Sequence, residues 1–119
     1  MPWKYDQSSG ELRYNGALIG TGYAGSGVGK NNPKMEHVAD VGPIPKGEYK
    51  IGPSYKSATG LGPIVMDLDP VGHNALGRTL FRIHGDNSTG TASEGCVIMP
   101  RTVREKVSIS QDRILEVVD

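Results

Sequence analysis

The sequence predicts a compact, mostly β domain with one short helix near its carboxyl end. Seventeen glycines and eight prolines break the chain of 119 residues into short segments, many of them rich in β-branched residues. Several of these segments alternate apolar and polar side chains, which is the pattern of a strand with one buried face. Residues 101–107 instead have the spacing of an amphipathic helix. A chain of this length is the size of one domain, so we expect a single domain over residues 1–119.

The first strands are expected to form a meander. Residues 3–5 and 11–14 alternate apolar and polar side chains and are separated by a short polar turn. Asn15-Gly16 is a strong signal for a two-residue hairpin, and it leads into a third strand over residues 17–19. These three strands therefore predict a structural role for the start of the chain.

Further strands are predicted along the rest of the chain. They cover residues 48–51, 63–69, 79–83, 97–99 and 112–118. Pro70 is expected to end the second of these, since proline removes a backbone hydrogen-bond donor. Pro100 suits the first position of a helix, and the helix that follows it puts Val103 and Val107 on one face.

Residues 20–33 form a long, glycine-rich loop. They contain a formal G-x-G-x-x-G motif at residues 20–25. A dinucleotide site needs that motif between a strand and a helix, and no helix is predicted after it. The segment is either a surface loop or the wall of a cleft in which Tyr23, Asn31 or Asn32 contacts a substrate.

Charge and composition argue against several classes of function. Thirteen basic and thirteen acidic residues cancel, and no long run of one sign occurs, so a nucleic-acid partner is not expected. No apolar stretch approaches membrane-spanning length, so no membrane insertion is expected. A single cysteine cannot form an internal disulfide. The cysteine and the histidines lack metal-binding spacings, so no metal site is expected.

The stretch from Phe81 to Met99 carries the predicted chemistry. It holds the only cysteine, Cys96, and one of three histidines, His84, twelve positions earlier. Strands before His84 and after Cys96, joined by a loop of small residues, can bring the thiol and the imidazole within hydrogen-bond reach. The imidazole would then take the thiol proton, and the amides of Gly95 and Cys96 would face an oxyanion. The alternative is an inert, buried cysteine and a histidine that merely closes a strand.

These residues resemble the catalytic signature of the L,D-transpeptidases, bacterial cell-wall enzymes in which a strand-borne His-Gly precedes a Ser-His-Gly-Cys segment. The resemblance is closer to the type VI secretion L,D-transpeptidase effectors, which carry an Ala-Ser-Glu-Gly-Cys form. It spans nearly the whole chain. The matching segments are Ile83-His84-Gly85, Ala92-Ser93-Glu94-Gly95-Cys96, Trp3-Lys4-Tyr5, Ser9-Gly10-Glu11-Leu12, Gly22-Tyr23-Ala24-Gly25, Asn31-Asn32-Pro33 and Gly42-Pro43-Ile44-Pro45-Lys46-Gly47-Glu48-Tyr49.

The resemblance implies the small β-sandwich-like fold of the L,D-transpeptidases, with the short helix following the catalytic cysteine. It also implies that Cys96 is the nucleophile and His84 the base of an L,D-carboxypeptidase or L,D-transpeptidase. The substrates would be peptidoglycan stem tetrapeptides, and no metal or organic cofactor would be needed. Such an effector would be an antibacterial toxin with a cognate immunity protein in its producer.

Residues 1–6 lack the apolar core of a signal peptide. The protein either stays in the cytoplasm, or is delivered by a route without a cleaved signal, or has lost a leading segment. The resemblance favours the second of these. We therefore expect synthesis in the cytoplasm and delivery by a secretion system to the periplasm of a target bacterium.

One position departs from the general transpeptidase signature. Glu94 stands where that signature has a second histidine; its carboxylate can orient His84, raise the pKa of the Cys96 thiol, or lie in solvent. Farther along, Arg101 and Arg104 either lie on a solvated helix face or grip a substrate carboxylate. The candidate substrate contacts are Tyr23, Asn32, Ser93, Glu94, Arg101 and Arg104.

Two other functions stay open. A cell-wall cysteine amidase or endopeptidase is the first, although that class usually places its cysteine before its histidine, and here His84 comes first. A non-catalytic wall-binding β module, in which Cys96 only packs, is the second. The reactivity of the thiol distinguishes an enzyme from such a module.

Overall fold

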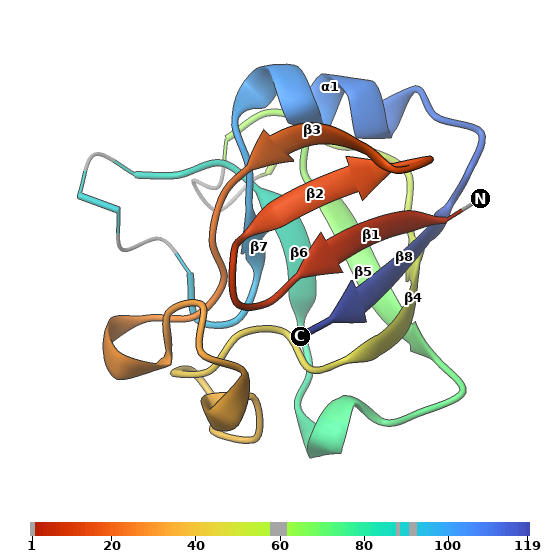
Figure 1. Ribbon diagram of the computed structural model, residues 1–119. Helices are drawn as coiled ribbons and strands as arrows, with labels where there is room; N and C mark the ends of the chain where they lie inside the picture. Colours follow the sequence, from red (N-terminus) through yellow and green to blue (C-terminus); the bar gives the residue numbers. More distant parts are fainter. Residues whose placement is uncertain (1, 58–61, 88, 91–92) are drawn as a thin grey trace.

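The computed structural model describes residues 2–57, 62–87, 89–90 and 93–119 (Figure 1). In this part of the chain, eight strands form one sheet in the order β3-β2-β1-β8-β4-β5-β6-β7. One α-helix, α1 (Arg101–Ser108), follows β7, and short 3-10 turns lie at Gly27–Gly29, Pro33–Met35 and Ala75–Gly77. The strands are β1 (Trp3–Asp6), β2 (Glu11–Tyr14), β3 (Ala17–Thr21), β4 (Gly47–Ile51), β5 (Met66–Val71), β6 (Phe81–His84), β7 (Val97–Ile98) and β8 (Ile114–Val118).

The first three strands form the predicted meander. Tyr14 of β2 pairs with Ala17 of β3 across the two-residue turn Asn15-Gly16. Both turn residues have positive φ, 51° and 82°, as the tight hairpin turn requires. β1 then pairs in parallel with β8, so the first and last strands of the chain are neighbours in the middle of the sheet.

The sheet curls until its two edges meet. In Figure 1 the strands β3, β2, β1 and β8 lie in front of β5, β6 and β7, and α1 covers the upper end. Tyr23, just after β3, bridges to Ile98 of β7 through N–H···O=C bonds of 3.2 and 2.8 Å. Gly22 permits this approach, because a Cβ there would lie 1.6 Å from the Ile98 carbonyl oxygen. The contact covers the backbone edge of β7 that would otherwise be open.

The predicted fold class is confirmed: the structure is compact and mostly β, with one α-helix after Cys96. The two layers of the expected sandwich belong to one continuous curled sheet. The expected end of a strand at Pro70 is wrong, because β5 continues to Val71 with Pro70 opposite Tyr49. Pairing of β5 with β6 stops at Leu68, so Pro70 lies where the strand has one partner, and there a proline is tolerated.

The sheet has an inner face filled by the core and an outer face that carries the polar side chains of β6. Phe81 and Ile83 of β6 belong to the core, and so do Val97 and Met99. Since side chains alternate along a strand, the intervening residues point outward. The residues on the outer face are Arg82, His84, Cys96 and Ile98.

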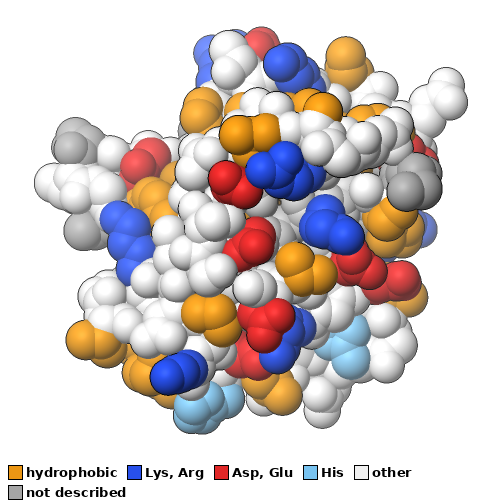
Figure 2. Space-filling model, in the orientation of Figure 1, with side chains coloured by type: hydrophobic (Ala, Val, Ile, Leu, Met, Phe, Trp, Pro, Cys, Tyr) orange, Lys and Arg blue, Asp and Glu red, His pale blue; other side chains and the backbone are white. Residues whose placement is uncertain are grey.

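The surface matches the balanced composition of the chain. On the face drawn in Figure 2, basic and acidic side chains are interspersed, and no extended area carries one sign of charge. Within the described residues, no helix is both long and apolar enough to cross a membrane.

Candidate active site

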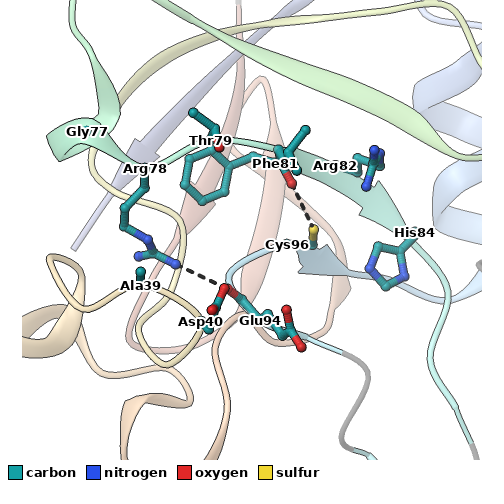
Figure 3. Close-up of a pocket in the computed structure, with 11 residues that line it drawn as sticks. Ala39, Asp40, Gly77, Arg78, Thr79, Phe81, Arg82, His84, Glu94 and Cys96 are labelled. Carbon is teal, nitrogen blue, oxygen red and sulfur yellow. Dashed lines mark hydrogen bonds between the residues drawn. The ribbon is translucent and has the colours of Figure 1, made fainter.

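The pairing of β6 with β7 places Cys96 and His84 on the same side of the sheet. The two strands are parallel, with Ile83 opposite Val97 and His84 opposite Ile98. Continued back by one residue, this register puts Cys96 beside Arg82. Cys96, Arg82 and His84 therefore share the outer face, and Figure 3 shows the imidazole and the thiol bordering the same hollow.

This hollow is a cavity of about 500 Å³. His84, Cys96 and Glu94 line it, together with Arg78 and Arg82, which the sequence did not single out. Cys96 is partly exposed as a residue and lines the cavity, whereas His84 is almost fully buried. The remaining lining residues are Ala39, Asp40, Gly77, Thr79, Leu80 and Phe81.

The imidazole of His84 is fixed in one tautomer. Its Nδ1 lies 2.8 Å from the Gly85 carbonyl oxygen. That oxygen can only accept, so Nδ1 carries the proton and Nε2 is left with a free lone pair. Burial lowers the pKa of His84, and the positive charges of Arg104 and Arg82 lower it further against the opposing effect of the Gly85 hydrogen bond. The ring is thus a neutral base with Nε2 as its accepting atom.

The thiol of Cys96 rests in its protonated form. Its sulfur lies 3.7 Å from the Leu80 carbonyl oxygen, and among the described residues no hydrogen bond joins it to His84. Burial raises the pKa of the Cys96 thiol, and the negative charge of Glu94 also raises it. A backbone hydrogen bond from Arg82 and the guanidinium charges of Arg82 and Arg78 oppose this rise. The site therefore holds a neutral thiol and a neutral imidazole, which suits proton transfer during attack.

Ser93, which the sequence predicts as a substrate contact, hydrogen-bonds the backbone around the cysteine. It is fully buried, and its Oγ accepts from the Gly25 and Gly95 amides at 2.8 and 3.1 Å. The hydroxyl in turn donates to the Cys96 carbonyl oxygen at 2.7 Å. The Gly95 amide is thereby engaged, which leaves the Cys96 amide as the remaining one of the two expected oxyanion donors.

Arg78 is the main structural element of the site that the sequence did not reveal. This nearly buried guanidinium donates to four backbone carbonyl oxygens. They belong to Glu36, Gly42, Pro43 and Glu94, at 2.6 to 3.2 Å. It also lies over the Phe81 ring, 5.2 Å from its centroid. The sequence around Arg78, an arginine shortly before an apolar strand, is an ordinary pattern. The carbonyl groups that it binds lie 16 to 42 residues away in the chain, so no local sequence pattern indicates its role.

Of the predicted substrate contacts, Glu94 lines the thiol cavity, whereas Tyr23, Asn32, Arg101 and Arg104 do not. Tyr23, Arg101 and Arg104 line a second cavity of about 410 Å³ next to it along β7. Asn32 instead caps the turn at Pro33–Met35, accepting from the Lys34 amide and donating to the Val28 carbonyl. Asn32 lines neither cavity, so its contacts are local and structural.

The arrangement supports thiol addition to a carbonyl with proton transfer to an imidazole. A metal ion would need several ligands gathered in one place. Among the residues that the structure describes, no three His, Cys, Asp or Glu side chains are grouped in a way that could hold one.

Comparison with curated proteins gives no match. A family model described as the Tlde1 domain matches residues 19–118, a range that includes His84, Cys96 and the strands β4 to β8. The match covers most of the chain and agrees with the effector family that the sequence motifs resemble. The chain belongs to the Tlde1-domain family, type VI secretion effectors with L,D-transpeptidase-like activity on peptidoglycan.

Proposed function

We propose that the protein is an L,D-carboxypeptidase and L,D-transpeptidase in which Cys96 is the nucleophile and His84 the base. The observation that carries this proposal is that thiol and imidazole border one cavity on the same face of β6 and β7. Nε2 of His84 is left to accept a proton because Nδ1 is held by the Gly85 carbonyl. The family supplies the substrate class, peptidoglycan.

The first half-reaction forms a thioester. The Cys96 sulfur attacks the carbonyl carbon of the diaminopimelate residue, the third residue of a stem tetrapeptide, while Nε2 takes the thiol proton. The Cys96 amide donates to the oxyanion that develops on the attacked carbonyl. The imidazolium then gives its proton to the amine of the terminal D-alanine, the carbon–nitrogen bond breaks, and D-alanine leaves.

The second half-reaction depends on the acceptor. Nε2 takes a proton from water, which attacks the thioester and releases a tripeptide and the Cys96 thiol, so that the net reaction is a carboxypeptidase cleavage. An amine acceptor instead forms a new amide bond and gives D-amino-acid exchange or transpeptidation. In each case the sulfur regains its proton from the imidazolium, so the enzyme is restored.

The biological role follows from this chemistry and from the family. Each cleavage converts a tetrapeptide stem into a tripeptide that is no longer a donor for cross-linking. Delivered to a competitor's periplasm, the enzyme would weaken the wall, and its producer would need an immunity protein that blocks the cavity. We include the toxic outcome, the periplasmic site of action and the immunity partner in the proposal.

The test is to incubate purified tetrapeptide muropeptides with the protein and determine the masses of the products. We expect loss of one alanine with the intact protein, and no product with Cys96→Ala or His84→Ala. His37→Ala is the matched control, because His37 is exposed and lies outside both cavities. Release of the entire stem peptide would indicate an amidase. An unchanged muropeptide, with an unreactive Cys96 thiol, would indicate a wall-binding module.

A further inference from the structure

The second cavity adjoins the reacting pair on the outer face of the sheet. It has a volume of about 410 Å³, and its lining includes Ile98, Asp86, Tyr23, Arg101 and Arg104. Ile98 of β7 follows Cys96 by two positions, so both side chains lie on the outer face of the sheet. Asp86 follows His84 by two positions. The cavity is therefore next to the catalytic pair along the strand direction, toward the start of α1.

The start of α1 brings positive charge to this cavity, and no acidic residue lies in the first turn of the helix. Pro100 caps the helix without any side-chain hydrogen bond. The first turn contains instead Arg101 and Arg104, at the end of a helix where the peptide dipoles are already positive. Negative groups normally stabilise this position. A bound carboxylate would place a negative charge at this turn.

The two arginines differ in how they are held. Arg104 is nearly buried, and its Nε donates to the Met99 carbonyl at 3.0 Å, while Nη1 donates to the Pro63 carbonyl. Arg101 is largely exposed, and its ion pair with Glu105 is long, 3.8 Å, so its guanidinium can turn toward a ligand at small cost. Arg101 is thus the flexible contact and Arg104 the fixed charge behind it.

Asp86 supplies the opposite charge at the same cavity. Its Oδ1 accepts from the Tyr23 hydroxyl at 2.6 Å and from the Asn87 amide at 2.8 Å. The ring of Tyr23 is itself covered by the Lys30 ammonium, 4.1 Å from the ring centroid. Among the described residues, no ion pair joins Asp86 to either arginine, so both signs of charge border the cavity separately.

We propose that this cavity binds an amino-acid terminus, a carbon that carries both a carboxylate and an ammonium group. Arg101 and the start of α1 bind the carboxylate, and Asp86 binds the ammonium. The proposal rests on the proposed function: in a donor stem peptide, the terminus is the side-chain end of the diaminopimelate residue whose carbonyl Cys96 attacks.

The distances favour the donor stem as the source of this group. At the rise of an extended chain, Cys96, just before β7, and Ile98 are about 6.6 Å apart along the strand direction. Diaminopimelate joins its two amino-acid carbons through three methylene groups, that is, by four carbon–carbon bonds of about 1.5 Å, which span ~5 Å in the extended zigzag. A free D-amino acid acceptor carries the same chemical group. Its amine must reach the thioester at Cys96, which it does not do while Asp86 holds it.

The cavity would therefore select between stem peptides. A stem with lysine at the third position offers the ammonium but lacks the carboxylate. A stem whose side-chain carboxylate is amidated keeps the ammonium and loses the negative charge. We expect the protein to prefer the free acid of diaminopimelate over both, with Arg101 responsible for much of the preference.

The test compares kcat/KM for two tetrapeptides, one with diaminopimelate and one with its side-chain amide. Arg101→Gln should lower kcat/KM for the free-acid tetrapeptide about tenfold, as expected for losing one charge-assisted hydrogen bond. The ratio of kcat/KM for the free acid to kcat/KM for the amide should then be near one. Lys106→Gln is the matched control, since Lys106 is an exposed cation on the same helix outside the cavity. An equal loss for both substrates would overturn the proposal, because it would show a structural effect.

A second measurement separates this proposal from the function on which it rests. Free meso-diaminopimelate is titrated into Cys96→Ala protein, with and without Arg101→Gln. Binding that weakens about tenfold in the double variant supports the cavity assignment even if no turnover occurs. Turnover without any Arg101-dependent binding or selectivity supports the enzyme and overturns the cavity assignment. Should Arg101→Gln reduce D-amino-acid exchange but not alanine release, the cavity holds the acceptor, and the donor assignment is wrong.

Discussion

Arg78 donates a hydrogen bond of 3.2 Å to the carbonyl oxygen of Glu94, two residues before Cys96, the proposed nucleophile. The same guanidinium binds the carbonyl oxygens of Gly42 and Pro43, so it ties the Cys96 loop to the segment before β4. A carbonyl-bound arginine keeps its charge without a carboxylate partner. The position of the sulfur therefore depends on a residue that does not take part in the proposed chemistry.

Replacing Arg78 should destabilise the protein strongly. Arg78→Gln leaves several buried carbonyl oxygens without their donor, and we expect the free energy of unfolding to fall by about 3 kcal/mol. Urea unfolding followed by tryptophan fluorescence measures this, since Trp3 lies in the core. Arg13→Gln, at an exposed ion pair with Glu11, should change stability by less than about 0.5 kcal/mol. Equal effects of the two substitutions would contradict the structural role of Arg78.

Gly95 should tolerate no side chain. Its φ is +131°, and a Cβ would lie 2.4 Å from an Arg78 guanidinium nitrogen and 3.2 Å from the Phe81 ring. Gly95→Ala therefore adds overpacking to backbone strain, and we expect a loss of more than about 2 kcal/mol together with altered alkylation of Cys96. Thermal unfolding and iodoacetamide labelling measure the two effects.

The matched control for that substitution is Gly72→Ala. Gly72 also has positive φ, +78°, but a Cβ there would meet no atom within 4 Å. It should cost about 1 kcal/mol from strain alone and leave the thiol unaffected. A Gly95→Ala protein as stable and as reactive as the Gly72→Ala protein would show that the close approach to Arg78 is unimportant.

Much of the fold could be predicted because its signals are local. The Asn15-Gly16 turn lies within one hairpin, and Pro100 with the Val103 spacing defines α1 without reference to distant residues. The pairing of β1 with β8 had no such signal, because Trp3 and Leu115 come from opposite ends of the chain. Strand order depends on packing among many segments, and a single sequence does not contain that information locally.

In the candidate site, too, the features with local sequence signals could be predicted, and those that depend on distant residues could not. Cys96 and His84 are close in sequence and flank two strands, so a shared cavity could be predicted from the loop between them. The predicted hydrogen bond between thiol and imidazole is not among those of the described residues. Tyr23 was considered as a substrate contact, but its partner Asp86 is 63 residues away and could not be identified. Ser93 is a small polar residue beside the cysteine, and only the structure reveals that its hydroxyl faces the backbone.

The pH dependence of the reaction should show a depressed imidazole pKa. Burial and neighbouring guanidinium charges lower the pKa of His84, so the ring loses its base function only below its ordinary value of about 6.5. The acid limb of kcat/KM should therefore have its midpoint below that value. Initial rates of alanine release across a pH series measure it, and a midpoint clearly above about 6.5 would contradict the buried, neutral imidazole.

A substitution at Arg82 should shift the acid limb of the pH profile of kcat/KM. Arg82→Gln removes a positive charge that disfavours the imidazolium, so the pKa of His84 should rise and the acid limb should move to higher pH. The same charge lowers the pKa of the Cys96 thiol, so the pH midpoint of iodoacetamide labelling should also rise. Lys4→Gln, whose charge pairs with Glu116 elsewhere on the sheet, should move neither midpoint. Opposite shifts of the two midpoints would be inconsistent with a shared guanidinium charge.

Ser93→Ala distinguishes a structural hydroxyl from a substrate contact. The substitution leaves the buried amides of Gly25 and Gly95 without an acceptor and the Cys96 carbonyl without its donor. We expect the free energy of unfolding to fall by about 2–3 kcal/mol, measured in urea, because unpaired buried polar groups cost their full desolvation. Ser54→Ala, at an exposed serine, should stay within about 0.5 kcal/mol of the parent. A Ser93→Ala protein with unchanged stability and a raised KM for the tetrapeptide would instead make Ser93 a substrate contact, because only a group that touches the ligand alters binding without altering the fold.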